Sequence, residues 1–220
     1  MKNTIIALYI NLLFVVFSNS AFAQYEVTTS VGDGPFGAFV LSPGETVDID
    51  ILLNEFDFGD PFFPRLGMGN SDGLNSFSIG VDLDGVGVSI ESETDVAINS
   101  LFDDSSELSV DLLPTGVEFT GGTLNANGIE VPENDFGFFS LVLATVTVTG
   151  VVPDSEVSIT ASAHTNGEPI VFADGSEVAA ENLGLGGIQI LVSVPEPSSS
   201  LLLFGIGGFA LTARKRRRAV

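Results

Sequence analysis

The segment LNSFSIGVDLD, residues 74–84, decides the fold class of this chain. Large apolar residues alternate in it with small or acidic ones, and the apolar positions are Phe77, Ile79, Val81 and Leu83. A period of two sends successive side chains to opposite faces of an extended chain. The segment therefore predicts a β-strand with one face in a core and the other in water.

The same alternation recurs along the chain. It predicts strands at residues 46–53, 107–113, 156–162 and 186–194. Residues 136–150 are apolar on both faces in their first half, which is typical of a strand in the middle of a sheet. Residues 94–102 fit either a short helix or a strand.

Turn signals rich in Gly, Pro and Asp separate these strands, at residues 42–44, 84–85, 114–116, 152–154 and 174–175. Many short strands between regular turns are typical of a sandwich. We therefore expect residues 24–194 to form one all-β domain, a two-sheet antiparallel β-sandwich of about eight or nine strands.

Three segments in this domain carry a resemblance. LSPGETVDIDILLNE (residues 41–55), LNSFSIGVDLDG (residues 74–85) and GFFSLVLATVTVTG (residues 137–150) are similar in order to elements of cohesin domains. The resemblance implies a jelly-roll sandwich that binds a partner, close in shape to some carbohydrate-binding modules. Residues 54–73 depart from it as an insertion, and no Tyr-Asp-Pro-like turn follows VDLDG, so dockerin binding is not carried over.

The first 23 residues have the features of a secretory signal peptide. Lys2 precedes an apolar run at residues 5–17, and Ala21 and Ala23 form a small-x-small cleavage site before Gln24. We expect signal peptidase to remove residues 1–23, the alternative being an uncleaved anchor helix.

The last residues form a second membrane signal, at residues 195–220. A motif precedes an uncharged segment at about residues 198–213, and its residues are Val194, Pro195, Glu196 and Pro197. A basic tail follows at residues 214–218, with Arg214, Lys215, Arg216, Arg217 and Arg218. A basic cluster stays cytoplasmic, so we expect a short C-terminal transmembrane helix with the domain outside.

This order of Pro-Glu-Pro, serines, apolar segment and arginines resembles the PEP-CTERM sorting signal of Gram-negative bacteria. The resemblance implies export, an inner-membrane intermediate, and processing by the membrane protease exosortase. It also implies a place at the cell surface or in the extracellular matrix, with a link to exopolysaccharide or biofilm.

The charge is strongly asymmetric. Residues 24–197 hold one basic residue, Arg65, and all 29 acidic residues, a formal charge of −28. Such a surface repels nucleic acid and anionic lipid, so we expect no nucleic-acid partner. It favours either solubility outside the cell or cation binding, and weak calcium candidates lie near turns at Asp82, Asp84, Asp103 and Asp104. We assign no metal and no cofactor.

Nothing in the pattern favours catalysis. The chain has no cysteine, and its single histidine, His164, stands in a loop signal where we expect solvent exposure. We expect no enzymatic activity, the alternative being a carbohydrate-active hydrolase that uses a carboxylate pair.

The insertion at residues 54–73 is the remaining unusual feature. Its aromatic residues and single base are Phe56, Phe58, Phe62, Phe63 and Arg65. Long irregular loops are often functional, so a partner-binding loop is one interpretation. A flap that covers an open end of the sandwich is the other.

These observations predict a non-enzymatic exported protein with a β-sandwich binding or structural module. Its expected contacts are an extracellular polysaccharide or a protein partner. A structural matrix protein crosslinked by calcium is a further alternative.

Overall fold

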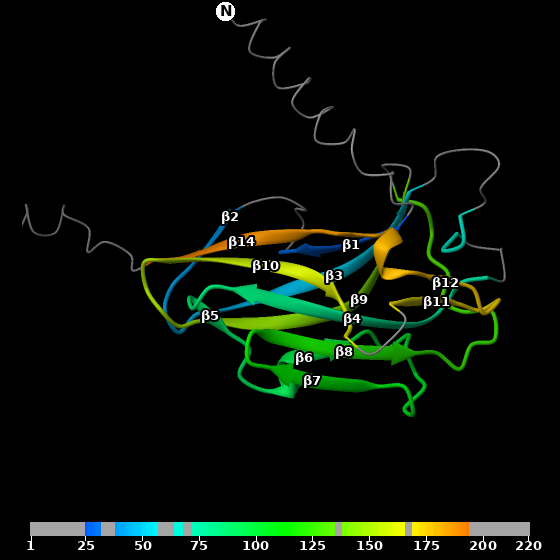
Figure 1. Ribbon diagram of the computed structural model, residues 1–220, viewed down its shortest axis with the longest axis horizontal. Helices are drawn as coiled ribbons and strands as arrows, with labels where there is room; N and C mark the ends of the chain where they lie inside the picture. Colours follow the sequence, from blue (N-terminus) through cyan, green and yellow to red (C-terminus); the bar gives the residue numbers. More distant parts are fainter. Residues whose placement is uncertain are drawn as a thin grey trace, which may run out of the picture.

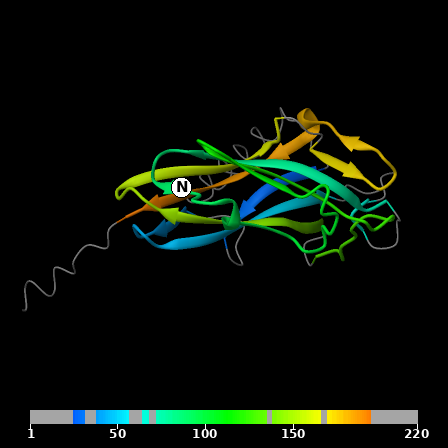
Figure 2. The same ribbon diagram turned by 90° about the horizontal axis from the view of Figure 1, so that it is seen from below.

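A computed structural model describes residues 25–31, 38–56, 64–67, 72–134, 138–165 and 169–193 (Figure 1). Two β-sheets account for most of these residues, and only two short 3-10 turns, Glu93–Asp95 and Ala180–Asn182, interrupt them. Figure 2 shows the sheets as two layers packed face to face. Among the described residues, no helix has the length and apolar character needed to cross a membrane.

The six-stranded sheet has the order β13-β1-β3-β9-β5, with β6 also paired to β9. Its strands are β1 (Tyr25–Ser30), β3 (Thr46–Phe56), β5 (Val88–Ser89), β6 (Val96–Ile98), β9 (Phe138–Gly150) and β13 (Leu183–Leu185). The β3–β9 pairing shifts register between Ile51 and Leu52. This bulge lets the consecutive residues Leu143 and Ala144 of β9 both lie buried.

The eight-stranded sheet has the order β12-β11-β4-β10-β14-β2. Strands β8 and β7 extend it from the other edge of β4. Its strands are β2 (Ala38–Leu41), β4 (Leu74–Asp84), β7 (Ser109–Leu113), β8 (Gly116–Gly122), β10 (Ser155–Ala163), β11 (Ile170–Phe172), β12 (Glu177–Val178) and β14 (Gly187–Val192).

The core lies between the two sheets. The alternating apolar residues of β3, β4 and β10 face inward there, and the largest buried side chains include Phe77, Phe119, Phe172, Ile49, Ile51, Leu53, Ile79 and Ile159. Each such side chain stabilises the fold by about 1.5–3 kcal/mol. The outward face of the six-stranded sheet is polar, since Thr145 and Thr147 of β9 donate hydrogen bonds of 2.7 Å to Asp50 and Asp48 of β3.

The all-β, two-sheet prediction is confirmed. The described residues contain fourteen strands, more than the eight or nine expected, because short strands at the sheet edges add to the long ones. Two pairings, β1–β13 and β2–β14, are parallel, although the remaining pairings are antiparallel as expected. Residues 94–102 complete a 3-10 turn and then form β6, which settles the ambiguity in that segment.

Candidate functional site

The insertion begins later than the sequence indicated. Strand β3 continues through Phe56, so residues 54–56 belong to the sheet and not to a loop. The Phe56 ring lies 5.7 Å from the ring of Phe138 on the neighbouring strand β9. Phe58, Phe62 and Phe63 lie outside the described residues, so the two interpretations of this loop stay open for them.

The segment where the insertion rejoins the sandwich, at Arg65 and Leu66, is held by the buried carboxylate of Glu55. The exposed fraction of Glu55 is 0%. Its Oε1 accepts hydrogen bonds from the Tyr25 hydroxyl (2.8 Å) and the Arg65 N–H (2.9 Å). Its Oε2 accepts one from the Leu66 N–H at 2.7 Å. Burial, together with the charge of Glu55, raises the pKa of Tyr25. Leu66 itself is fully buried, so this end of the insertion is part of the core.

Arg65 lies against the sandwich. Its guanidinium carbon is 4.9 Å from the ring centre of Phe172, and its Nη1 is 3.3 Å from Asp174 Oδ1. It also donates to the Ser176 hydroxyl. Hydrogen bonds from Ser176, and secondarily the positive charge of Arg65, hold the pKa of Asp174 below its usual value. The one base of residues 24–197 is therefore bound within its own domain.

The four calcium candidates lie in two places. Asp82 and Asp84 are exposed on β4. Asp103 and Asp104 lie after β6, where Asp104 accepts hydrogen bonds from the N–H and hydroxyl of Ser106. These bonds hold the pKa of Asp104 below its usual value. The described part of the chain contains no group of three or more His, Cys, Asp or Glu residues that could hold a metal ion.

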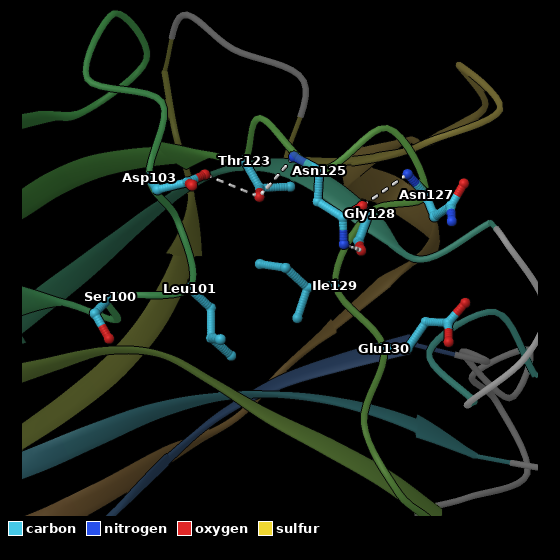
Figure 3. A pocket seen from close by; sticks show the side chains of 9 residues that line it. All are labelled: Ser100, Leu101, Asp103, Thr123, Asn125, Asn127, Gly128, Ile129 and Glu130. Carbon is cyan, nitrogen blue, oxygen red and sulfur yellow. Dashed lines mark hydrogen bonds between the residues drawn. The ribbon is translucent and has the colours of Figure 1, made fainter.

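A pocket of about 470 Å³ opens between two loops, one carrying residues 100–103 and the other residues 123–130 (Figure 3). Leu101 and Ile129 point into its middle, while Asp103, Thr123 and Asn125 stand along one side. The pocket therefore combines an apolar floor with a polar rim, as small-ligand and side-chain sites do.

The second loop is fixed by its own side chains. Asn125 accepts a hydrogen bond from the Asn127 N–H (3.1 Å) and donates one to the Gly128 carbonyl (2.6 Å). Gly128 has a φ of +72°, and its backbone lies so close to Gly73 that a Cβ would stand 2.2 Å from the Gly73 carbonyl oxygen. The conformation of this loop is thus held by its own hydrogen bonds and by its close approach to Gly73.

Asp103 joins the two loops. Its Oδ1 accepts hydrogen bonds from the Leu124 N–H at 2.9 Å and the Thr123 hydroxyl at 3.1 Å. These two bonds hold the pKa of Asp103 below its usual value. The carboxylate is therefore ionised at neutral pH and held in one orientation.

His164 is not the solvated loop residue that the sequence indicated. Its side chain is only 11% exposed, and Nε2 lies 3.4 Å from Glu118 Oε2. Glu118 also accepts hydrogen bonds from the N–H and the hydroxyl of Thr165. The carboxylate thereby ties the chain that leaves β10 to β8, across the intervening strand β4, which is a structural role.

Several of the predicted functional residues lie outside the described ranges. They are the cleavage residues Ala21, Ala23 and Gln24, the motif residues Val194 to Pro197, and the basic residues 214–218. The predicted segments 1–23 and 198–213 lie there too. The last described strand, β14, ends at Val192, immediately before the predicted sorting motif.

Fold and chain order define an all-β sandwich whose last strand leads into a C-terminal sorting segment. Residues 193–218 match the PEP-CTERM protein-sorting motif. The chain therefore carries this motif, which indicates export and sorting to the cell surface. Among curated proteins, none matches the chain.

Solved structures similar to this chain include cohesin modules. CaCohA2 from Clostridium acetobutylicum has a TM-score of 0.48 and 15% identity, over 78% of this chain and 94% of that chain. The type I cohesin–dockerin complex Coh-OlpA-Doc918 from Clostridium thermocellum has a TM-score of 0.42 and 14% identity, over 76% of this chain and 99% of that chain. A type III cohesin module of the ScaE scaffoldin from Ruminococcus flavefaciens has a TM-score of 0.39 and 9% identity, over 79% of this chain and 90% of that chain.

Proposed function

We propose that this chain is a non-enzymatic exported protein whose β-sandwich serves as a binding or structural module at the cell surface or in the extracellular matrix. The observation that carries the proposal is the PEP-CTERM motif at residues 193–218, which begins one residue after β14 ends. The folded domain thus lies entirely before the sorting segment. In this proposal the module contributes to an exopolysaccharide matrix or biofilm.

The proposed route uses both ends of the chain. Signal peptidase cuts after Ala23, and the uncharged residues 198–213 halt in the inner membrane with the basic residues 214–218 in the cytoplasm. Pro195 and Pro197 keep the chain extended in front of the membrane, where exosortase reaches it. Cleavage there removes all five terminal basic residues.

The buried acids support a structural role for the domain. Glu55 and Glu118 are the buried carboxylates of the described residues, and both accept hydrogen bonds from the backbone N–H groups of neighbouring loops. Carboxylates used in this way position loops, and their oxygens are already engaged as hydrogen-bond acceptors. The hydrolase alternative would show itself as polysaccharide turnover that is lost when a carboxylate pair is neutralised.

The proposal is tested by mass spectrometry of the C-terminus of the mature protein from the host and from a host without exosortase. We expect the mature protein to lack residues 214–218, and a longer membrane-bound form to accumulate without exosortase. Replacing Pro195, Glu196 and Pro197 together by Ala should give the same longer form, whereas Ser199→Ala should not. Recovery of intact Arg214–Val220 on the surface protein would contradict the proposal.

A further inference from the structure

We propose that the pocket between residues 100–103 and 123–130 binds a basic side chain, an arginine or a lysine, presented by a protein partner. The inference deepens the proposed function and rests on it only in taking the sandwich to be a binding module. The juxtaposition that carries it is an ionised carboxylate, fixed by two hydrogen bonds, beside an aliphatic floor made by the exposed Leu101 and the buried Ile129. The one base of residues 24–197, Arg65, is bound elsewhere in the domain.

Asp103 supplies the acceptor. Its Oδ1 is occupied by the Leu124 N–H and the Thr123 hydroxyl. Its Oδ2 accepts no hydrogen bond from any other described residue, and the same two bonds to Oδ1 fix the direction in which it points. An ionised acceptor in a fixed orientation forms charge-assisted hydrogen bonds with an ammonium or guanidinium group, and these are stronger than neutral ones.

Leu101 and Ile129 supply the floor for the aliphatic part of such a side chain. Leu101 is 49% exposed, whereas the next residue, Phe102, is 2% exposed. Phe102 packs edge-on against Phe77 at 4.7 Å and so anchors the loop that holds Leu101 at the surface. Arginine and lysine lay their methylene stems on apolar surface of this kind while their charged ends reach a polar rim.

The chain already binds its own arginine with the same combination of groups. At Arg65, an aspartate fixed by hydrogen bonds from a hydroxyl and a backbone N–H, Asp174, stands beside an apolar surface, the ring of Phe172. At the pocket, Asp103 is fixed by Thr123 and Leu124 beside Leu101 and Ile129. The pocket therefore has the chemistry that this fold uses to hold a cation.

The charge of residues 24–197 leaves no free cation within the domain itself for this pocket. Arg65 is the only base in residues 24–197, and it is bound to Asp174. A formal charge of −28 over the same residues attracts basic partners and repels acidic ones. The same field discriminates against an anionic polysaccharide at this pocket.

The pocket needs no rearrangement to bind. Asn99 donates to the Val142 carbonyl (2.8 Å) and accepts from the Leu101 N–H (3.1 Å), which fixes the first loop to β9. Asn125 fixes the second loop, and Gly73 donates a backbone hydrogen bond of 2.9 Å to the Asn127 carbonyl. Because both walls are already ordered, binding immobilises little of this chain.

The test measures the affinity of the exported protein, purified from the host with its C-terminus as found, for a blocked four-residue arginine peptide. A glutamine peptide of the same length serves as the uncharged probe. Asp103→Asn keeps the two hydrogen bonds to Oδ1 and replaces the free acceptor by a donor. Asp111→Asn is the matched control, because it removes the same charge from the exposed strand β7, outside the pocket.

We expect Asp103→Asn to weaken arginine-peptide binding about fivefold and Asp111→Asn less than about twofold. Leu101→Ser should also weaken binding of the arginine peptide. Because Leu101 is half-exposed, we expect this variant to stay folded, and its unfolding midpoint checks that. Equal losses in the two aspartate variants would mean diffuse attraction and overturn the proposal. So would binding of the glutamine peptide with equal affinity, or displacement of the arginine peptide by calcium or a neutral oligosaccharide at Asp103. Sorting is read from the C-terminus alone, so either proposal can fail without the other.

Discussion

Glu55 shows how a single residue ties an irregular segment to this sandwich. Its fully buried carboxylate accepts one hydroxyl and two backbone N–H groups, those of Tyr25, Arg65 and Leu66. All the donors converge on a group that is acceptor-only when ionised. A neutral replacement of the same shape cannot satisfy them all.

We predict that Glu55→Gln lowers the free energy of unfolding by about 2–3 kcal/mol, because its amide NH₂ faces a donor whichever way it is turned. Urea unfolding measures this change. The exposed Glu177 of β12 is the matched control, and Glu177→Gln should change stability by less than about 0.5 kcal/mol. A loss of equal size in both variants would show that Glu55 acts only through its charge.

Two acids should respond to pH in opposite directions. Burial raises the pKa of Glu26, which lies half-buried on β1 between β3 and β13. The folded state therefore keeps the proton of Glu26 to a higher pH than the unfolded state does. The contribution of Glu26 to folding stability is present below its unfolded pKa and is lost as pH rises through its folded pKa. For Asp103 the folded pKa is lowered, so its contribution is present above the unfolded pKa and lost as pH falls through the folded one.

We therefore predict that Glu26→Gln gains stability relative to the unmodified protein at pH 7, and that the gain shrinks toward about pH 3, below the unfolded pKa of glutamate. Asp103→Asn should lose stability at pH 7, with a loss that also shrinks toward acid pH. Denaturant unfolding at both pH values measures the two differences. Changes of the same sign at pH 7 would contradict the assignment.

At the scale of elements, strands with a full inward face were predictable. Strand β4 has the bounds that the alternation indicated, Leu74–Asp84, and β3 has its odd-numbered residues from Val47 to Leu53 on the core side. The same alternation puts Glu55 on the core side, so its burial was available from the sequence. The short strands β5, β12 and β13 were not predictable, because a run of two or three residues is too short to show an alternation, and pairing in the fold makes them strands. For β6 the sequence left a helix and a strand open.

The pocket was only partly visible in the sequence. Asp103 was singled out as an oxygen ligand near a turn, and the run NANG at residues 125–128 is a turn signal. What the sequence does not show is that the two loops meet, since Asp103 and Thr123 are 20 residues apart and are joined by a hydrogen bond across the end of the sheet. His164 was misassigned for the same reason, because its partner Glu118 lies on another strand.

We predict that Gly128→Ala destabilises the domain more than Gly175→Ala does. Both glycines have a positive φ, +72° and +80°, so an added Cβ strains both backbones alike. Only at Gly128 would that Cβ meet another atom, the Gly73 carbonyl oxygen at 2.2 Å, whereas at Gly175 nothing lies within 4 Å. The Gly128 variant should lose about 1–3 kcal/mol more in urea unfolding. Equal losses would mean that the loop moves away from β4 without cost.

At the scale of the whole molecule, charge is separated along the chain. Residues 24–197 carry −28, and the five basic residues near the C-terminus stand together beyond the uncharged segment. The domain that folds therefore has almost no positive charge with which to form ion pairs. Among its described residues, the ion pair that involves a lysine or an arginine is Arg65–Asp174. Repulsion among carboxylates must oppose folding, and hydrophobic burial between the two sheets offsets it.

We predict that sodium chloride stabilises this domain. Raising the salt from about 0.01 M to about 0.5 M shortens the screening length from about 30 Å to less than about 10 Å, which weakens repulsion between carboxylates spread over the surface. The unfolding midpoint should rise by about 3–6 °C, the shift that about 1–2 kcal/mol gives in a domain of this size. Neutralising two exposed acids of the described residues, with Glu177→Gln and Glu181→Gln together, should raise the midpoint at low salt and have less effect at high salt. The test uses sodium chloride and not a sulfate salt, because sulfate is excluded from protein surfaces and would stabilise the fold independently of charge screening. A midpoint that falls with sodium chloride would mean that attractive pairs outweigh the repulsion, and would contradict this account of the charge.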